Sequence, residues 1–338
     1  MEVKRKLPEN FSQSHLRYFE PNLVINLTEP GCKWFSKNIF LLSNGILING
    51  LKVEKQSLLY NTRLKDIGGV ITLIKMIIKS ILKNKPAVIH DEVSYVTIVN
   101  EWTNNYFHWF TEAIPKLICL MEKDKKPMVL LPANYQSDYQ TRSLDIMGFS
   151  YKSFSGNLVI CKNIFLPSRL APSSAQYNPQ AMKQIAMKLK EAVKLDIKKG
   201  RRLYVSRQKA TIRKIINEVD VVKLVKEFDF EVINFEYYNL DEQISIMHHS
   251  EILVSIHGAG LTNMIFCKPN TSVLEISLKN QTMDKCYFNL ANAMDLRYYY
   301  QFCETNNDSL PYTSADLIVS LNDLKNNLSL MIKNSPLS

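Results

Sequence analysis

Residues 251–277 read EILVSIHGAGLTNMIFCKPNTSVLEIS, and they predict a strand, a turn, a short helix and a second strand. The apolar run from Ile252 to Ile256 is typical of a strand that is buried on both faces of a parallel sheet. A helix is expected to start in Leu261–Phe266, and a second apolar run, 273–276, predicts the next strand. The stretch therefore predicts an α/β fold.

The turn inside this stretch is His257-Gly258-Ala259-Gly260. Two glycines separated by one alanine allow a tight turn and a close approach of the backbone to a ligand. The N–H groups at the start of the following helix carry a partial positive charge, which favours phosphate. Glu275 lies near the end of the second strand, at the edge where ligands of open α/β sheets bind. The pattern is equally compatible with a turn that only connects a strand to a helix.

The preceding 50 residues show the same alternation of strands and helices. They predict strands at 202–206 and 230–235 and helices at 219–228 and 240–249, which together with 251–277 make one half of a doubly wound fold. Arg207 follows the end of the first of these strands, where a phosphate ligand is expected. Arg213 lies in the polar loop that comes next.

A second stretch of interest is 104–121, NNYFHWFTEAIPKLICLM, which predicts a helix capped by Asn104 or Asn105 and kinked at Pro115. His108 and Glu112 are four residues apart and share one face of this helix. A carboxyl group beside a histidine among aromatic side chains is a plausible general base. A buried structural His–Glu pair is the alternative, and the residues alone leave both open.

Other segments predict local structure without chemistry. Apolar runs joined by Ser43-Asn44-Gly45 predict a β-hairpin within 38–51, and Gly148 is expected to close a helix over 139–147. Residues 70–83 predict an amphipathic helix with a lysine stripe. That helix either packs on a core or lies on an anionic membrane surface. Further helices are expected at 179–199 and 314–333.

Composition limits the class of protein. The 338 residues suffice for two domains, and a net charge of +10 favours an anionic partner. Basic residues are scattered without interleaved aromatics, which argues against nucleic acid. The six cysteines contain no C-x-x-C pair, so neither a zinc site nor a redox motif is indicated, and a reducing compartment is expected. The first 15 residues lack the apolar segment of a signal peptide.

Taken together, three blocks make the sequence resemble glycosyltransferase family 61. The blocks cover about half of the chain. They are Asn105-Tyr106-Phe107-His108-Trp109 with Glu112 and Pro115; Leu203-Tyr204-Val205-Ser206-Arg207 with Arg213, Asn217-Glu218 and 240–243; and the HGAGLTN turn, 257–263, with Val273-Leu274-Glu275.

This resemblance implies a GT-B architecture, in which two Rossmann-like domains face each other across a cleft. Residues 1–195 would form an acceptor-side domain that carries the His108/Glu112 helix. Residues 196–312 would bind the nucleotide sugar, and the C-terminal helix in 313–338 would pack back on the N-terminal domain. The implied reaction is inverting and metal-independent, with no cofactor besides the nucleotide-sugar substrate, which we expect to carry UDP.

The resemblance also implies residue roles. Glu112 would deprotonate the acceptor hydroxyl, and His108 would either replace it as the base or orient it. Asn105 and Trp109 would lie on the acceptor side. The donor-binding residues would be Arg207, Arg213, His257, Gly258, Ala259, Gly260, Leu261, Thr262, Asn263 and Glu275, with Glu275 on the ribose hydroxyls.

The expected function is sugar transfer to a glycan or lipid-linked glycan in surface polysaccharide biosynthesis. The expected location is the cytoplasm, at the inner face of a membrane. Two other hypotheses remain at this point. A nucleotide-sugar epimerase of GT-B fold would turn over the donor without an acceptor, and a non-catalytic binding module would form no product.

Overall fold

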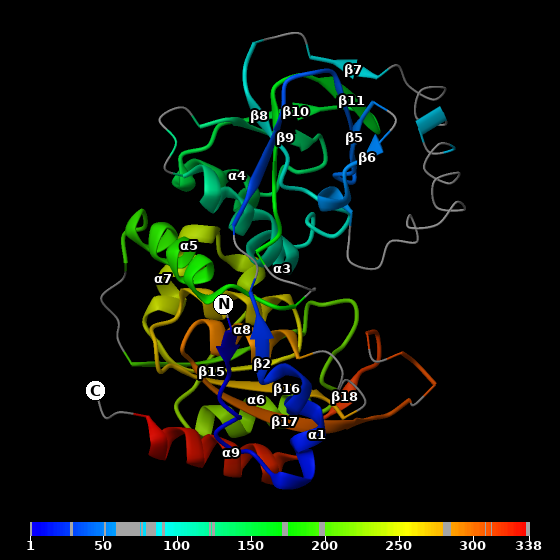
Figure 1. The fold of residues 1–338 in the computed structure, drawn as a ribbon. Coiled ribbons are helices and arrows are strands. Elements are labelled where there is room, and N and C mark those ends of the chain that lie inside the picture. Colours follow the sequence, from blue (N-terminus) through cyan, green and yellow to red (C-terminus); the bar gives the residue numbers. More distant parts are fainter. Residues whose placement is uncertain are drawn as a thin grey trace. The chain divides into compact units, whose positions relative to one another are not determined.

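The structure is a computed structural model. It describes residues 2–27, 30–50, 52–58, 75, 77–78, 86–89, 92–121, 123, 126–170, 175–195, 200–279, 285–307, 309–311 and 313–335. The chain divides into two compact units (Figure 1). Unit 1 consists of Met1–Leu27 and Ala175–Ser338, and unit 2 consists of Thr28–Ser174.

Unit 1 is built on a six-stranded sheet with the strand order β14-β13-β15-β16-β17-β18. The first five strands are parallel, and β18 is antiparallel to β17. The elements of unit 1 are β1 (Glu2–Lys4), α1 (Leu16–Phe19), β2 (Val24–Asn26), α5 (Pro179–Glu191), β13 (Arg201–Val205), α6 (Glu218–Glu227), β14 (Glu231–Ile233), α7 (Leu240–His248), β15 (Ser250–Ile256), the 3-10 helix η8 (Ala259–Phe266), β16 (Ser272–Leu278), α8 (Cys286–Ala293), β17 (Arg297–Thr305), β18 (Leu317–Ile318) and α9 (Leu321–Asn334), with short 3-10 turns at Gln13–His15, Glu20–Asn22 and Phe235–Tyr237.

The strand order creates a switch point between β13 and β15. From β13 the chain moves outward to β14 and then returns to the other side of β13 to form β15. The two strands pair in parallel with Val205 opposite Ser255, so their carboxyl ends are neighbours. Ligands of doubly wound sheets bind at such a point. The segments that follow these two ends are the ones that carry Arg207 and His257.

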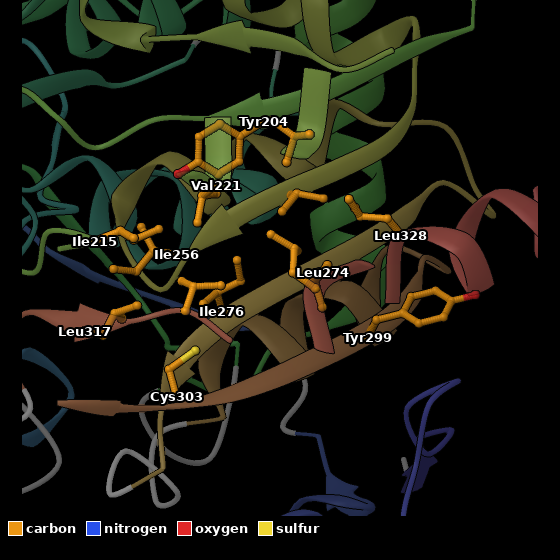
Figure 2. Packing of buried hydrophobic residues seen from close by; sticks show 14 of the residues in the cluster. Tyr204, Ile215, Val221, Ile256, Leu274, Ile276, Tyr299, Cys303, Leu317 and Leu328 are labelled. Carbon is orange, nitrogen blue, oxygen red and sulfur yellow. The ribbon is translucent and has the colours of Figure 1, made fainter. Parts of the chain in front are cut away.

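Helices cover both faces of this sheet, as the doubly wound pattern predicts. On one face α6 and α9 contact each other, and on the other α5, α7, α8 and η8 form a connected layer. The core beneath α6 and α9 includes Val221, Leu274, Tyr299 and Leu328 (Figure 2). All four side chains have no exposed surface.

The structure divides the chain differently from the predicted boundaries at 195 and 312. Helix α9 packs in the core of unit 1 together with β17, rather than back on the N-terminal domain. The first 27 residues also belong to unit 1, because Phe19 is fully buried against Phe288 and Tyr300. These contacts join residues about 270 positions apart, so no local pattern predicts them.

Unit 2 contains two five-stranded sheets with the orders β10-β9-β8-β12-β3 and β6-β5-β4-β11-β7. Its elements are β3 (Cys32–Phe35), β4 (Ile39–Leu42), β5 (Leu47–Asn49), β6 (Lys52–Val53), the 3-10 turn Lys55–Ser57, β7 (Ala87–Val88), β8 (Tyr95–Val96), α3 (Tyr106–His108), the π-helix η5 (Trp109–Ala113), the 3-10 helix η6 (Ile114–Leu120), β9 (Met128–Pro132), α4 (Asp138–Met147), β10 (Tyr151–Phe154), β11 (Leu158–Cys161) and β12 (Ile164–Pro167).

The sheets of unit 2 depart from a simple Rossmann-like domain. In the first sheet β10, β9, β8 and β12 are parallel, which fits the prediction. In the second sheet β6, β5, β4 and β11 pair antiparallel in turn, whereas β11 and β7 pair in parallel. The predicted hairpin belongs to this second sheet: Ile39 pairs with Asn49, and Gly45 has φ +83° in the turn.

The predicted amphipathic helix over 70–83 lies outside the described residues, apart from Lys75, Ile77 and Ile78. Among the helices that the structure describes, none has the length and apolar composition needed to cross a bilayer.

Removing core volume from α9 tests its assignment to unit 1. Leu328→Ala should lower the free energy of unfolding by about 2–5 kcal/mol, because the side chain is fully buried and a cavity remains. Leu321→Ala in the same helix is the matched control. It should cost about 0.5 kcal/mol or less, because Leu321 is 37% exposed. Urea unfolding followed by circular dichroism measures both, and equal losses would contradict the assignment.

Candidate functional site

The first candidate site is the pair Arg207 and Arg213, just beyond the carboxyl end of β13. Nη2 of Arg207 donates a long hydrogen bond of 3.4 Å to the Ile212 carbonyl. Nε of each arginine is buried and has no hydrogen-bond partner within the described part of the chain. Burial, followed by the positive charge of Arg213, lowers the pKa of Arg207. Neighbouring cations with unused buried donors favour an anionic ligand.

Two hydroxyl groups fix the strand end that presents Arg207. Glu218, in the first turn of α6, is 5% exposed. Its Oε1 accepts hydrogen bonds from Ser206 Oγ at 2.7 Å and from Tyr204 Oη at 3.0 Å. The Ser206 hydroxyl also accepts from the amide of Gln208. The backbone on both sides of Arg207 is therefore held in place.

Gly258 is required because Arg207 lies against it. A Cβ atom at position 258 would overlap Nη1 of Arg207 and lie 2.9 Å from its Cζ. The backbone of Gly258 is extended (φ 167°), so side-chain space rather than conformation selects glycine here. Gly260 serves packing, since a Cβ there would come within 3.2 Å of Val205 Cγ1. The small-residue turn thus brings η8 close to β13 and leaves room for the Arg207 guanidinium.

Replacing this glycine tests the contact. Gly258→Ala should weaken binding of inorganic pyrophosphate, used as an anionic probe, about 10- to 100-fold, because Arg207 must move and charge-assisted hydrogen bonds contribute about 1.5–3 kcal/mol. The melting temperature should change little, since the displaced group is the flexible end of a side chain. Gly31→Ala is the control, because its Cβ would meet Ser168 Oγ at an ordinary 3.5 Å. Calorimetry in which both variants bind pyrophosphate like the wild type would contradict the geometry.

His257 lies at the end of β15 and is 6% exposed. Its Nδ1 is 2.5 Å from Oε1 of Glu275, and its ring packs edge-on against Tyr287 at 4.9 Å. Oε2 of Glu275 accepts a hydrogen bond of 2.5 Å from Tyr298 Oη. Burial, followed by the Glu275 charge, raises the pKa of Tyr298, so this hydroxyl remains a donor.

The placement of Glu275 in its strand differs from the predicted one. The residue lies in the middle of β16 rather than near its end, and it is 2% exposed with both oxygens engaged. A carboxylate in this position holds His257.

The remaining turn residues are more deeply buried than expected. Leu261, Thr262 and Asn263 are at most 1% exposed, and Asn263 Nδ2 donates to Gln243 Oε1. The Leu261 amide donates to the Gly258 carbonyl and closes the first turn of η8. These three side chains shape the turn. Ala259 and Gly260 are partly exposed.

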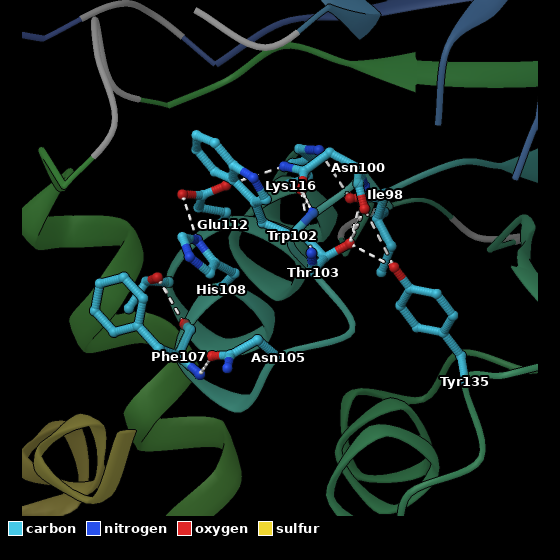
Figure 3. A network of polar contacts seen from close by, with 11 residues as sticks. Ile98, Asn100, Trp102, Thr103, Asn105, Phe107, His108, Glu112, Lys116 and Tyr135 are labelled. Atoms are coloured by element: carbon cyan, nitrogen blue, oxygen red, sulfur yellow. Dashed lines mark hydrogen bonds and ion pairs between the residues drawn. The ribbon is translucent and has the colours of Figure 1, made fainter. Parts of the chain in front are cut away.

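The second candidate site lies in unit 2 and joins His108, Glu112 and Asn100 (Figure 3). Nδ1 of His108 is 2.9 Å from Glu112 Oε1, and Nδ2 of Asn100 donates to Glu112 Oε2 at 2.9 Å. Their helical spacing on α3 and η5 brings His108 and Glu112 together as predicted. Asn100 comes from the segment between β8 and α3.

Charge around Glu112 favours its ionised form. Burial by itself would raise the pKa of Glu112, but the hydrogen bond and charge of His108, with help from Asn100 and Lys116, hold the pKa below its usual value. Lys116 Nζ donates to the Ile98 carbonyl at 2.8 Å. Burial lowers the pKa of Lys116 to about 8, which the Glu112 charge opposes and the Arg169 charge reinforces.

Comparison with known proteins identifies the family. The family model described as Glycosyltransferase 61 matches residues 106–274, half of the chain. The chain belongs to glycosyltransferase family 61. The matched range begins one residue after Asn105 and ends one residue before Glu275. It therefore includes the His108–Glu112 pair, Arg207 and the HGAGLTN turn.

Curated relatives of this family member are EGF domain-specific O-linked N-acetylglucosamine transferases. The protein from Gallus gallus is 35% identical over 91 residues, which cover 25% of this chain and 17% of that protein. The protein from Mus musculus is 34% identical over the same coverage. The protein from Drosophila melanogaster is 30% identical over 98 residues, 28% of this chain and 18% of that protein. The match thus spans less than a fifth of the length of these relatives.

The structure shows where the two expected acceptor-side residues of this family 61 protein lie. Trp109 is fully buried, and its Nε1 donates to Ser143 Oγ at 2.9 Å, so it is a core residue. Asn105 is exposed and caps α3 by accepting from the Phe107 amide. The predicted kink is a change of helix type: the π-helix ends at Ala113, and the 3-10 helix containing Pro115 follows. The π-helical turn, a rare form found mostly at functional sites, carries Glu112.

Sequence reasoning missed Asn100, Lys116 and Tyr298. Neither Asn100 nor Tyr298 belongs to the three blocks that carry the family resemblance. Lys116 shares a helical face with Glu112 at a spacing of four, which is the signal that could have revealed it. Across the described ranges, no cluster of three or more His, Cys, Asp or Glu side chains could hold a metal ion.

Proposed function

We propose that this family 61 member is an inverting, metal-independent glycosyltransferase. It moves a sugar from a UDP-linked donor to a hydroxyl group of a glycan or lipid-linked glycan. The observation that carries this proposal is the pair Arg207 and Arg213, whose buried Nε groups have no partner among the described residues. The pair lies beside Gly258 at the switch point of a parallel sheet, where an anionic ligand is expected.

The arginines act on the leaving group. As the bond from the anomeric carbon to the diphosphate breaks, negative charge grows on the diphosphate oxygens. Fixed guanidinium groups in a partly buried site stabilise that charge, as a metal ion would in other enzymes. Glu218 and Gly258 hold Arg207 in position, so little reorganisation is needed during the reaction.

The His108–Glu112 pair acts on the acceptor. Its task is to take the proton of the acceptor hydroxyl while that oxygen attacks the anomeric carbon from the face opposite the diphosphate. This single displacement inverts the anomeric configuration. In this proposal unit 1 is the donor half and unit 2 the acceptor half of a GT-B enzyme.

N-acetylglucosamine is the first sugar to test, because the relatives' names contain it. We also propose that the acceptor belongs to surface polysaccharide biosynthesis and that the enzyme contacts an anionic membrane surface. The net charge of +10 supports contact with anionic partners.

A thermal-shift screen against nucleoside diphosphates and nucleotide sugars tests donor binding. UDP should raise the melting temperature of the wild type, and Arg207→Gln should weaken UDP binding about 10- to 100-fold. Lys223→Gln, on the exposed surface of α6, removes the same charge and should bind UDP normally. If Arg207→Gln and Lys223→Gln bind UDP equally well, the site assignment is wrong.

Chelation tests the metal-free mechanism. EDTA should leave the rate of sugar transfer unchanged, because arginine side chains supply the positive charge at the diphosphate. The measurement is product formation with and without EDTA. Strong inhibition that a divalent cation reverses would refute this part of the proposal.

A further inference from the structure

We infer that Nε2 of His108 is the proton acceptor of the transfer reaction, that Glu112 orients His108, and that Asn100 positions Glu112. This inference rests on the proposed transferase function and assigns roles within its acceptor site. Of the two expected alternatives, it selects His108 rather than Glu112 as the base.

The first argument is that both oxygens of Glu112 are occupied. Oε1 contacts His108 Nδ1 and Oε2 accepts from Asn100 Nδ2, each at 2.9 Å. A carboxylate whose two oxygens already accept hydrogen bonds is a weaker base than a free one, because those bonds stabilise its charged form. A neutral imidazole carries a lone pair on one ring nitrogen, which can accept the proton.

The second argument fixes the proton on the imidazole. An ionised carboxylate is purely an acceptor, so Nδ1 of His108 must carry the hydrogen that points to Glu112. In neutral imidazole the lone pair is then on Nε2. The His108 side chain is 23% exposed and that of Glu112 16% exposed, so His108 is the more accessible of the two. Its ring packs between Trp102 at 5.3 Å and Phe107 at 4.9 Å.

The third argument concerns the orientation of the Asn100 amide. Its Oδ1 accepts from the amides of Trp102 at 2.8 Å and Thr103 at 3.1 Å. Because backbone N–H groups require an acceptor, the oxygen must face them and the NH₂ group must face Glu112. The backbone N–H of Asn100 donates to Thr103 Oγ1, which in turn contacts Tyr135 Oη. Asn100 is therefore held on the side opposite Glu112.

The proton and electron balance is complete without a further reactant. The acceptor O–H proton moves to Nε2 while the acceptor oxygen bonds to the anomeric carbon. The electron pair of the breaking C–O bond leaves with the diphosphate. The resulting imidazolium is stabilised by Glu112, and it returns its proton to solvent after the product leaves.

Nitrogen-15 NMR of histidine-labelled protein tests the tautomer without any ligand. The chain has six histidines, and His108→Gln identifies the His108 signals. Neutral His108 should show a protonated Nδ1 and an unprotonated Nε2. The opposite tautomer would overturn the inference. This measurement remains decisive even if the wild type turns over no tested donor, so failure of the proposed function is seen separately.

Chemical rescue tests the roles in turnover, with UDP release from UDP-N-acetylglucosamine as the probe. His108→Ala should lose about 10²–10⁴-fold in rate, and added imidazole should restore at least tenfold. Glu112→Ala should lose less, and formate should not restore it. Rescue of Glu112→Ala by formate, with no rescue of His108→Ala by imidazole, would assign the base to Glu112 instead.

Asn100→Asp tests the positioning residue. Aspartate keeps the acceptor for the amides of Trp102 and Thr103 but places a second negative charge beside Glu112. The acidic limb of the pH–rate profile should move to higher pH, because added negative charge favours the protonated forms. The other charged groups of this network are Lys116, which acts on Glu112, and Arg169, which acts on Lys116, and both should act equally in the two proteins.

Asn178→Asp is the matched control, because Asn178 caps α5 by accepting from the Ala181 amide and aspartate caps equally well. Its pH–rate profile should match the wild type. An unchanged profile in Asn100→Asp would overturn the role of Asn100.

Discussion

The fit of the Arg207 guanidinium against the bare backbone of Gly258 is the constraint on which the anionic site depends. Parallel pairing of β13 with β15 brings two strand ends together, and any side chain at position 258 would occupy the space of the cation. Glu218 then holds the strand end through Ser206 and Tyr204. Glycine is therefore favoured at position 258 by the limited space beside Arg207 and not by backbone conformation.

A similar arrangement occurs once in each unit. His108 contacts Glu112 and His257 contacts Glu275, in both cases from Nδ1 to Oε1. The second oxygen of each glutamate is held by a neutral donor, the Asn100 amide or the Tyr298 hydroxyl. The pairs differ in depth, because the His257 pair has side chains at most 7% exposed and the His108 pair reaches 23%. The deep pair shapes a turn, and the shallower pair is the one that we propose to take the proton of the acceptor.

Sequence patterns predicted the caps, strands and side-chain pairs that depend on residues close together in the chain. Asn105 caps α3 as expected, Gly148 closes α4 with φ +71°, and the strands around 251–277 occur as predicted. Helical spacing was enough to pair His108 with Glu112. The burial of Trp109 and Glu275 could not be predicted, because it depends on Ser143 and Tyr298, which come from other elements. The contact of Asn100 with Glu112 and the packing of α9 also depend on residues from other elements, so they could not be predicted either.

The path of the chain makes unit 2 an insertion within unit 1. The chain starts in unit 1, leaves it after Leu27 and returns at Ala175. Phe19 finds its partners Phe288 and Tyr300 far along the chain. During synthesis, residues 2–27 therefore cannot bury their apolar side chains in unit 1 until the whole of unit 2 has been made. Unit 2 can fold first. Unit 1 completes its core after Met331, in α9, has left the ribosome, so it is the unit more exposed to misfolding and to chaperone capture.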